Sequence, residues 1–300
     1  MSFSSNVKAE LTRPPIGRTC CAVAEAYGIL LYCNTFSASE VRVVTESREL
    51  SRRLGLLFKK AFNLEFDKVQ GLESDGGKVN FFITSPEKRN MIADALGIEG
   101  ERTVAHRINF GLLEEECCRT AFVRGAFLAG GSVTDPEKRY HLELATSHFH
   151  VSRGMSVLLL DMGFSPKDVI RKGNYVTYFK QSDAIEDFLT KMGAPVSAMQ
   201  VMNAKVEKDM RNAVQRQVNC DTANVEKAVE AAQGQISAIR KLERDVGLES
   251  LPDKLQETAL LRIFNPEASL AELASLSNPP VSKSCINYRL KKLVQLAGIH

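Results

Sequence analysis

Apolar and polar positions follow the same order in two stretches of the chain, residues 18–98 and 115–195. In the second stretch, an apolar segment predicts a buried helix that ends at Gly130-Gly131. Alternating apolar positions predict strands, and Gly173-Asn174 predicts the turn of the last hairpin. The expected helices are 116–129, 149–162 and 182–192, and the expected strands are 132–134, 141–145, 168–171 and 175–180.

The first stretch predicts equivalent elements. Ser47 and Ser85 are expected to cap two of its helices, and Pro86 suits a first helical turn. Both stretches therefore predict an αββαββα unit of an α+β fold. The expected helices are 22–32, 47–62 and 85–97, and the expected strands are 41–45, 65–71 and 79–84, the last two joined by the turn Asp75-Gly76-Gly77.

The two stretches share residues at a constant spacing of 97 positions. Cys20-Cys21 correspond to Cys117-Cys118 in this way. Residues 122–132, Phe-Val-Arg-Gly-Ala-Phe-Leu-Ala-Gly-Gly-Ser, resemble the LAGLIDADG motif of homing endonucleases. In that family the motif helix ends in an acid that binds the catalytic metal. Cys33 and Gly130 occupy the two acid positions, and neither binds a hard divalent cation as a carboxylate does. The resemblance implies a two-repeat LAGLIDADG-like fold without its catalytic residues.

Small residues on the two motif helices predict that the helices cross closely. They are Gly28, Gly125, Ala126 and Ala129. A tight helix crossing in another α+β protein would use the same residue types, but the matching element order in both stretches favours the nuclease-like fold. Asp135 lies five residues beyond the acid position and would reach a metal only if the helix were longer than predicted.

Residues 199–245 are charged, rich in alanine and almost free of strand signals. They predict two helices, 204–217 and 222–245, with a break at residues 218–221 and a cap at Asp221 or Thr222. The expected organisation is a LAGLIDADG-like domain (1–198), a helical linker (199–221) and a helical C-terminal domain (222–300).

The residues after Pro252 predict three helices, 253–264, 270–276 and 283–297. Ser269 and Glu272 have the spacing of a capping box, and Ser282 is expected to cap the third helix. Two short helices, a tight turn and a longer helix are typical of a helix-turn-helix DNA-binding domain. Its apolar core is expected to consist of Leu270, Leu273, Ala274, Ile286, Leu290, Leu293 and Val294.

The third of these helices is basic and contains no acid. A recognition helix presents its first residues to base edges in the major groove, so Asn287 is expected to contact a base and Arg289 a phosphate. A solvated amphipathic helix would carry a similar charge, but the capped short helix and the turn at Asn278-Pro279-Pro280 favour binding to double-stranded DNA. The residues expected to contact DNA are Ser269, Ser282, Lys283, Ser284, Asn287, Tyr288, Arg289, Lys291 and Lys292.

Composition narrows the remaining classes of protein. A hydrophobic fraction of 44% and a net charge of +3 are ordinary for a globular chain. The apolar run at 22–33 contains Glu25 and is too short to cross a membrane, so a cytoplasmic protein without membrane contact is expected. The seven cysteines form no C-x-x-C pair and are expected to be reduced, with the Cys-Cys pairs acting as small apolar residues. His148 and His150 lack partners for a metal site, so neither a metal nor a cofactor is expected.

Several strings along the whole chain resemble the WhiA family of bacterial DNA-binding regulators. The resemblance implies a degenerate LAGLIDADG domain without nuclease activity, joined to a helix-turn-helix. It also implies a role in sporulation gene expression, cell division or chromosome segregation. The matching strings are residues 1–11, the two Cys-Cys helices, and residues 122–132, 216–224, 246–252 and 279–284.

Two other functions stay open at this point. An active homing endonuclease needs two motif acids, and the sequence supplies none. An adaptor that binds other transcription or cell-division proteins, with incidental DNA contacts, would differ from a regulator in having no preference among DNA sequences.

Overall fold

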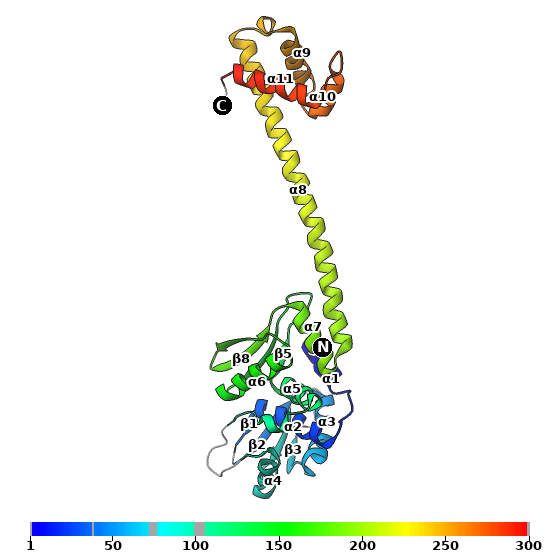
Figure 1. Ribbon diagram of the computed structural model, residues 1–300, viewed down its shortest axis with the longest axis vertical. Helices are drawn as coiled ribbons and strands as arrows, with labels where there is room; N and C mark the ends of the chain where they lie inside the picture. Colours follow the sequence, from blue (N-terminus) through cyan, green and yellow to red (C-terminus); the bar gives the residue numbers. More distant parts are fainter. Residues whose placement is uncertain (1, 38, 72–76, 99–105, 299–300) are drawn as a thin grey trace. The chain divides into compact units, whose positions relative to one another are not determined.

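The structure, a computed structural model, describes residues 2–37, 39–71, 77–98 and 106–298 (Figure 1). The chain forms two compact units, Met1–Lys208 and Asp209–His300. Each unit has a hydrophobic core of its own. Within the described ranges, no helix combines the length and the apolar character needed to span a bilayer.

The first unit contains both predicted αββαββα repeats. The first repeat consists of α2 (Thr19–Tyr32), β1 (Thr35–Phe36), β2 (Val41–Thr45), α3 (Arg48–Phe62), β3 (Lys68–Gln70), β4 (Val79–Ile83) and α4 (Pro86–Leu96). The second consists of α5 (Glu116–Gly130), β5 (Gly131–Val133), β6 (Leu142–Thr146), α6 (Phe149–Asp161), β7 (Lys167–Arg171), β8 (Asn174–Phe179) and α7 (Ser182–Met192). Their antiparallel sheets have matching strand orders, β1-β2-β4-β3 and β5-β6-β8-β7. The α+β fold class and the repeat are thereby confirmed.

The sheets bury one face because apolar side chains alternate along the central strands. In the first repeat, Val41 of β2 pairs with Ile83 of β4, and Val43 pairs with Phe81. All four side chains are buried, so the paired strands present one continuous apolar face to the core.

The motif helices α2 and α5 cross at two glycines. A Cβ atom at Gly28 would lie 2.1 Å from the carbonyl oxygen of Phe122, and one at Gly125 would lie 2.0 Å from that of Glu25. Both distances are far shorter than any tolerable contact, so a side chain at either position would push the backbones apart. The predicted close crossing is confirmed.

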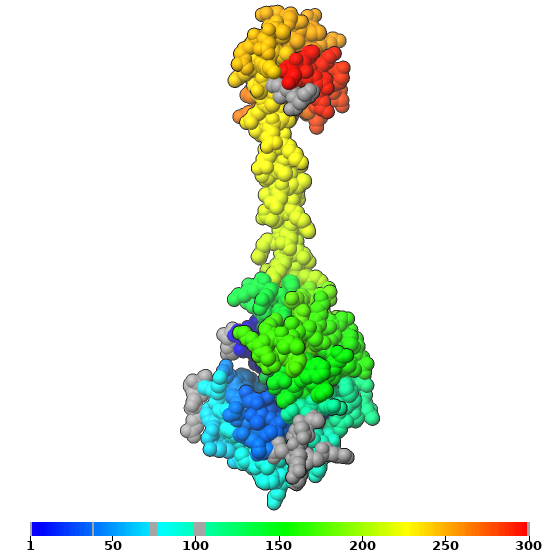
Figure 2. Space-filling view, turned by 90° about the vertical axis from the view of Figure 1, so that its left-hand side faces the viewer, coloured from blue at the N-terminus to red at the C-terminus, as the bar shows by residue number. Residues whose placement is uncertain are grey.

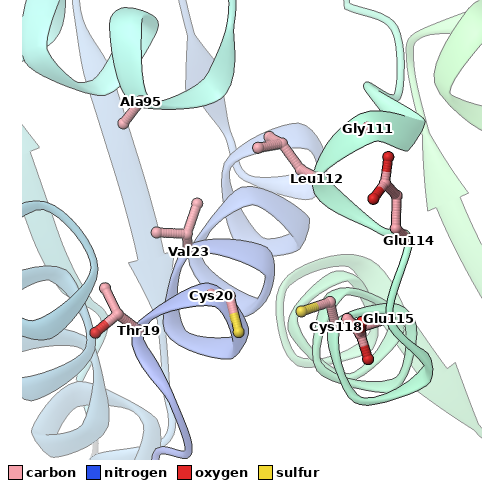
Figure 3. A pocket seen from close by; sticks show the side chains of 9 residues that line it. All are labelled: Thr19, Cys20, Val23, Ala95, Gly111, Leu112, Glu114, Glu115 and Cys118. Atoms are coloured by element: carbon pink, nitrogen blue, oxygen red, sulfur yellow. The ribbon is translucent and has the colours of Figure 1, made fainter.

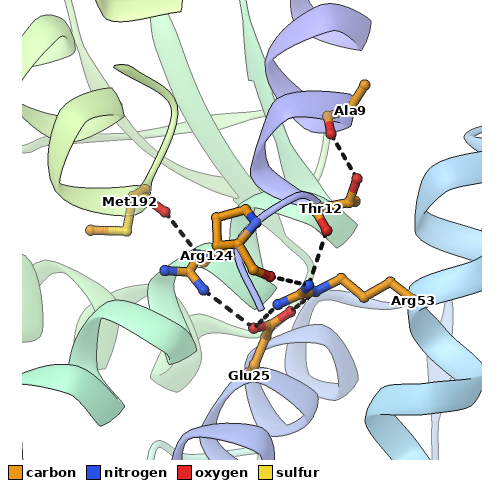
Figure 4. Close-up of polar contacts among 7 residues, drawn as sticks. Ala9, Thr12, Glu25, Arg53, Arg124 and Met192 are labelled. Carbon is orange, nitrogen blue, oxygen red and sulfur yellow. Dashed lines mark hydrogen bonds and ion pairs between the residues drawn. The ribbon is translucent and has the colours of Figure 1, made fainter. Parts of the chain in front are cut away.

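A buried ion-pair cluster joins α2 to its neighbours (Figure 4). The carboxylate of Glu25 accepts hydrogen bonds from Arg53 Nε at 2.6 Å and Nη2 at 2.8 Å. Arg124 Nη1 lies 3.5 Å from the same carboxylate, and its Nε donates to the carbonyl oxygen of Met192. Arg53 also donates to the carbonyl oxygen of Thr12. Losing one partner of such a cluster would leave an uncompensated buried charge.

Asp67, and not the predicted cap Ser85, makes the side-chain hydrogen bonds just before α4. The Ser85 side chain makes no capping hydrogen bond, whereas Asp67 Oδ2 accepts from the amides of Thr84 at 2.6 Å and Ser85 at 2.8 Å. Lys88 and these amides lower the pKa of Asp67 to about 2. The other cap, Ser47 on α3, is confirmed.

Two further details differ from the sequence-based expectations, and one expectation is untested. The β7–β8 turn is formed by Lys172 and Gly173, both with positive φ, because Asn174 already belongs to β8. α1 (Phe3–Leu11) and the short helix η1 (Phe110–Leu112) were not predicted. The turn expected at residues 75–77 lies mostly outside the described residues.

α8 (Pro195–Asp245) is one continuous helix, so the predicted break at residues 218–221 is wrong. No proline or glycine occurs between residues 196 and 233, and Asn219 and Asp221 weaken a helix only slightly. Thr222 Oγ1 donates to the carbonyl oxygen of Val218 and so fits inside the helix. The domain limits predicted at residues 198 and 221 both fall within this helix.

The second unit contains the three predicted C-terminal helices. They are α9 (Asp253–Phe264), α10 (Leu270–Leu276) and α11 (Lys283–Leu296), preceded by the short helix η2 (Leu248–Ser250). Most of the predicted core is buried, with Leu270 and Val294 partly buried at its edge. Ala238, Ile239 and Leu242 of α8 belong to the same core.

Candidate nucleic-acid interface

The two predicted caps fix the starts of α10 and α11. Ser269 Oγ accepts from the Glu272 amide at 3.2 Å, and the Glu272 carboxylate accepts from the Ser269 amide at 2.7 Å. Ser282 Oγ accepts from the Cys285 amide at 3.3 Å. Both serines are exposed. Because the oxygen of each hydroxyl accepts a capping hydrogen bond, its hydrogen atom is what it can still donate to a ligand.

Glu257 of α9 connects the turn before α11 with α11 itself. Its Oε1 accepts from the Asn278 amide at 2.8 Å, and its Oε2 lies 3.9 Å from Arg289 Nη1. The Arg289 side chain is only 12% exposed and also contacts Thr258 Oγ1 at 3.4 Å. Arg289 therefore holds α11 against α9, and the phosphate contact expected for it is not supported.

Arg262 holds the other turn, between α9 and α10. Its guanidinium is buried and donates to the carbonyl oxygen of Ala268 at 2.7 Å, with longer contacts to Asn265 and Pro266 at 3.4 Å. Burial lowers the pKa of Arg262. Charged side chains of α9 thus fix both turns that orient the recognition helix. Sequence reasoning missed Glu257 and Arg262, because their partners are distant carbonyls and amides.

One face of α11 points to solvent, opposite the buried residues Ile286, Leu290 and Leu293. Lys283 and Lys292 are exposed beside this face, and Asn287 is half-buried at its edge. In Figure 2, α11 lies in the red surface of the C-terminal unit. The exposed positions, called here the α11 face, recur at helical spacing and are Ser284, Tyr288, Lys291 and Gln295.

The α11 face has the chemistry of a DNA-contacting surface. Residues 273–298 contain no acid, so nothing on α10 after Glu272 or on α11 repels a phosphate. Lysine side chains pair with phosphates, and the amides of Asn287 and Gln295 match the donor and acceptor pattern of adenine. Tyr288 is 66% exposed and offers both a ring face and a hydroxyl group. Gln295 was not predicted, although its spacing from Tyr288 was available as a signal.

The two acid positions of the motif helices, Cys33 and Gly130, offer no carboxylate. The Cys33 thiol donates to the carbonyl oxygens of Leu30 and Thr35, and burial raises its pKa to about 12. A Cβ atom at Gly130 would lie 2.8 Å from the carbonyl oxygen of Ala145 and 2.8 Å from Tyr32 Cδ1. One acid position therefore holds the protonated thiol of Cys33. The other, Gly130, has no room for a side chain.

A polar pocket of about 710 Å³ opens beside the end of α5. Lys8 of α1 lines it, and burial lowers the pKa of this amine to about 8. Of the two carboxylates in the lining, Glu46 lies 3.7 Å from Lys78 Nζ, and Glu49 accepts from Ser47 Oγ at 2.9 Å. The pocket therefore combines cations with carboxylates that already have partners.

Asp135 and the histidines behave as structural side chains. Asp135 Oδ1 accepts from the Glu137 amide at 3.0 Å in the turn after β5, and α5 ends where predicted. The His148 ring packs on His106 with a centroid separation of 3.8 Å, while His150 is exposed on α6. His148 and His150 lie at the start of α6 and not on a strand, which was the arrangement considered for a joint metal site.

Comparisons with known proteins agree with both halves of this structure. A family model described as the WhiA LAGLIDADG-like domain matches residues 119–211, and one described as the WhiA C-terminal HTH domain matches residues 214–297. The "Probable cell division protein WhiA" of Alkaliphilus metalliredigens is 39% identical over 310 residues, covering 99% of this chain and 98% of the relative. Its namesake in Staphylococcus haemolyticus is 36% identical over 304 residues, covering 99% and 96%.

A solved structure has the same fold. The crystal structure of full-length DUF199/WhiA from Thermatoga maritima superimposes with a TM-score of 0.61 and 24% identity, covering 99% of this chain and 98% of that one. The fold and the site define a helix-turn-helix protein that carries a LAGLIDADG-like domain. The chain belongs to the WhiA family.

Proposed function

We propose that this protein is a sequence-specific DNA-binding transcriptional regulator that acts in cell division, chromosome segregation or sporulation. The observation that carries the proposal is the exposed, acid-free α11 face, positioned by the caps and by the contacts of Glu257 on α9 with Asn278 and Arg289. The names of the relatives from Alkaliphilus and Staphylococcus support the division role. Binding to chromosomal DNA would place the protein at the nucleoid, in the cytoplasm.

The proposed contacts follow from exposure and residue type. Asn287 and Gln295 are proposed to contact the edges of bases, and Tyr288 is proposed to contact a sugar or a base. Arg289 acts indirectly, by positioning α11. The side chains proposed to contact phosphates are the three lysines and the hydroxyl groups near the helix starts: Lys283, Lys291, Lys292, Ser269, Ser282 and Ser284.

We further propose that the LAGLIDADG-like domain has no nuclease activity, since neither acid position carries a carboxylate to bind a hard divalent cation. Incubating the protein with plasmid DNA and Mg²⁺ is expected to leave the plasmid supercoiled. Nicking that survives stringent purification and disappears in Asp135→Ala would contradict this.

Genome-wide mapping of bound sites, followed by titration of a bound site and a scrambled duplex of equal length, tests the regulator proposal. A preference of at least about 10³-fold for the mapped site is expected. Lys291→Ala is expected to weaken binding. The matched control is Lys227→Ala, which removes an exposed lysine of α8 that precedes the three helices α9, α10 and α11.

The adaptor function is the alternative, and one observation favours it. Met210, Val214 and Val218 recur along α8 at a spacing of four residues and are 65%, 64% and 51% exposed. Such a stripe suits a partner helix. Equal affinity for mapped and scrambled duplexes would refute the regulator proposal and leave the adaptor.

A further inference from the structure

Four cysteines from the two repeats meet at one end of the first unit, in what is called here the thiol cluster (Cys20, Cys21, Cys117 and Cys118). In each motif helix the cysteines are the second and third residues, so they lie in the first turns of α2 and α5. The Sγ atoms of Cys20, Cys21 and Cys118 all lie within 4.8 Å of one another. The sulfur atoms of Cys20 and Cys118 point toward one another from the two helices in Figure 3.

The fourth sulfur atom, Cys117 Sγ, is on the residue next to Cys118 and lies 2.8 Å from Arg18 Nη2. The cluster therefore combines three mutually close sulfur atoms, from Cys20, Cys21 and Cys118, with a fourth on Cys117.

The role of small apolar packing residues that the sequence favoured is confirmed for Cys118, which is in the core, and for Cys21 and Cys117, which pack against it. It does not account for Cys20, which is exposed. All seven cysteines of the chain are free thiols. Alanine would meet the packing requirement at these positions, yet both repeats have cysteine there.

We propose that the thiol cluster binds a zinc ion, with Cys20, Cys21 and Cys118 as ligands and Cys117 as the fourth. A zinc–sulfur bond of about 2.3 Å gives sulfur separations of about 3.8 Å in a tetrahedral site, which small rotations of these side chains would reach. Thiolate ligands select a thiophilic ion over the hard cations that nucleases use.

A pocket of about 340 Å³ beside the cluster provides a path of entry, and its lining includes Cys20, Cys118, Glu114 and Glu115 (Figure 3). The site lies at the start of α2 and α5, whereas the acid positions of the motif lie at their ends. The bound ion would therefore clamp the two repeats together and take no part in DNA cleavage.

Metal analysis of the full-length protein, expressed with zinc and purified without a histidine tag, tests the proposal. About one zinc ion per chain is expected, and cobalt substitution is expected to give sulfur-to-cobalt charge-transfer bands. Cys118→Ser is expected to reduce the zinc content to a trace. The matched control, Cys220→Ser on α8, is expected to keep the full content.

Because a substitution in the buried part of the cluster could impair folding, a second measurement uses the unaltered chain. Alkylation followed by mass spectrometry is expected to modify the exposed Cys220 and to spare the equally exposed Cys20 until a chelator is added. Zinc below about 0.1 per chain in folded protein, alkylation of Cys20 without chelator, iron with sulfide in place of zinc, or a disulfide within the cluster would each overturn the proposal.

Discussion

Substitution Gly125→Ala tests the closest contact in the LAGLIDADG-like domain. Gly125 is placed on α5 where a Cβ atom would lie 2.0 Å from the carbonyl oxygen of Glu25 on α2. An ordinary contact between carbon and a carbonyl oxygen needs about 3.3 Å. The two helix backbones must therefore separate by more than about 1 Å, because backbone atoms cannot rotate away as a side chain can.

The magnitude follows from two opposing effects. Overpacking a well-filled core costs about 1–3 kcal/mol, and a backbone-to-backbone clash belongs at the upper end. Alanine favours the helix over glycine by about 1 kcal/mol. We expect a net loss of about 2 kcal/mol in the free energy of unfolding. For a unit of this size, that loss lowers the Tm by about 4–8 °C.

Gly55→Ala is the matched control. Gly55 lies on α3, and an added Cβ atom there meets nothing within 4 Å. The same substitution should therefore stabilise the chain by about 1 kcal/mol. Calorimetry of the full chain measures both variants, since it separates the transition of the first unit from that of the second. A Tm for Gly125→Ala equal to or above that of the parent would refute the close crossing.

Three further results are expected. Lys291→Ala should weaken binding to specific and random duplexes alike and reduce the salt slope by about one, whereas Asn287→Ala should cost about 1–3 kcal/mol on the specific duplex only; equal effects in titrations at several salt concentrations would contradict this. Because the pKa of Asp67 is lowered to about 2, the stability that its charge contributes is present above about pH 4 and is lost as pH falls through about 2. Asp67→Asn keeps an acceptor for the amides but loses the charge beside Lys88, so it should cost up to about 1 kcal/mol at neutral pH and nothing in strong acid, as measured by urea unfolding across pH. The fragment of residues 222–300 should fold and bind DNA weakly, since Ala238 to Ala297 span its whole core; circular dichroism showing an unfolded fragment would contradict that.

Local signals made the repeats and the helix-turn-helix predictable. The bounds of α10 follow from the cap at Ser269 and from the turn Ser277-Asn278-Pro279-Pro280, both within a few residues of the helix. The unpredicted α1 had a comparable signal, since Phe3, Val7 and Leu11 recur every four residues after the cap Ser2. The false break in α8 came from giving weak helix formers the weight of true helix breakers.

Contacts between distant residues could not be predicted in this way. Arg289 and Lys291 look equally suited to a phosphate in the sequence, and only the position of Glu257 separates them. The meeting of Cys20 with Cys118 depends on how two helices cross, and no local pattern encodes that crossing. Roles of single side chains were therefore less predictable than the elements that carry them.

The contact of Gly130 with Tyr32 has an evolutionary consequence. A carboxylate at position 130 would collide with the Tyr32 ring and with the backbone of Ala145. Removing the buried ring first would cost about 3–5 kcal/mol and restore no activity, because Cys33 would still lack a carboxylate. Each single step back toward a metal-binding nuclease is thus harmful or useless by itself. Under the proposed loss of nuclease activity, no single substitution at position 130 supplies a metal-binding carboxylate without a compensating change in its neighbours.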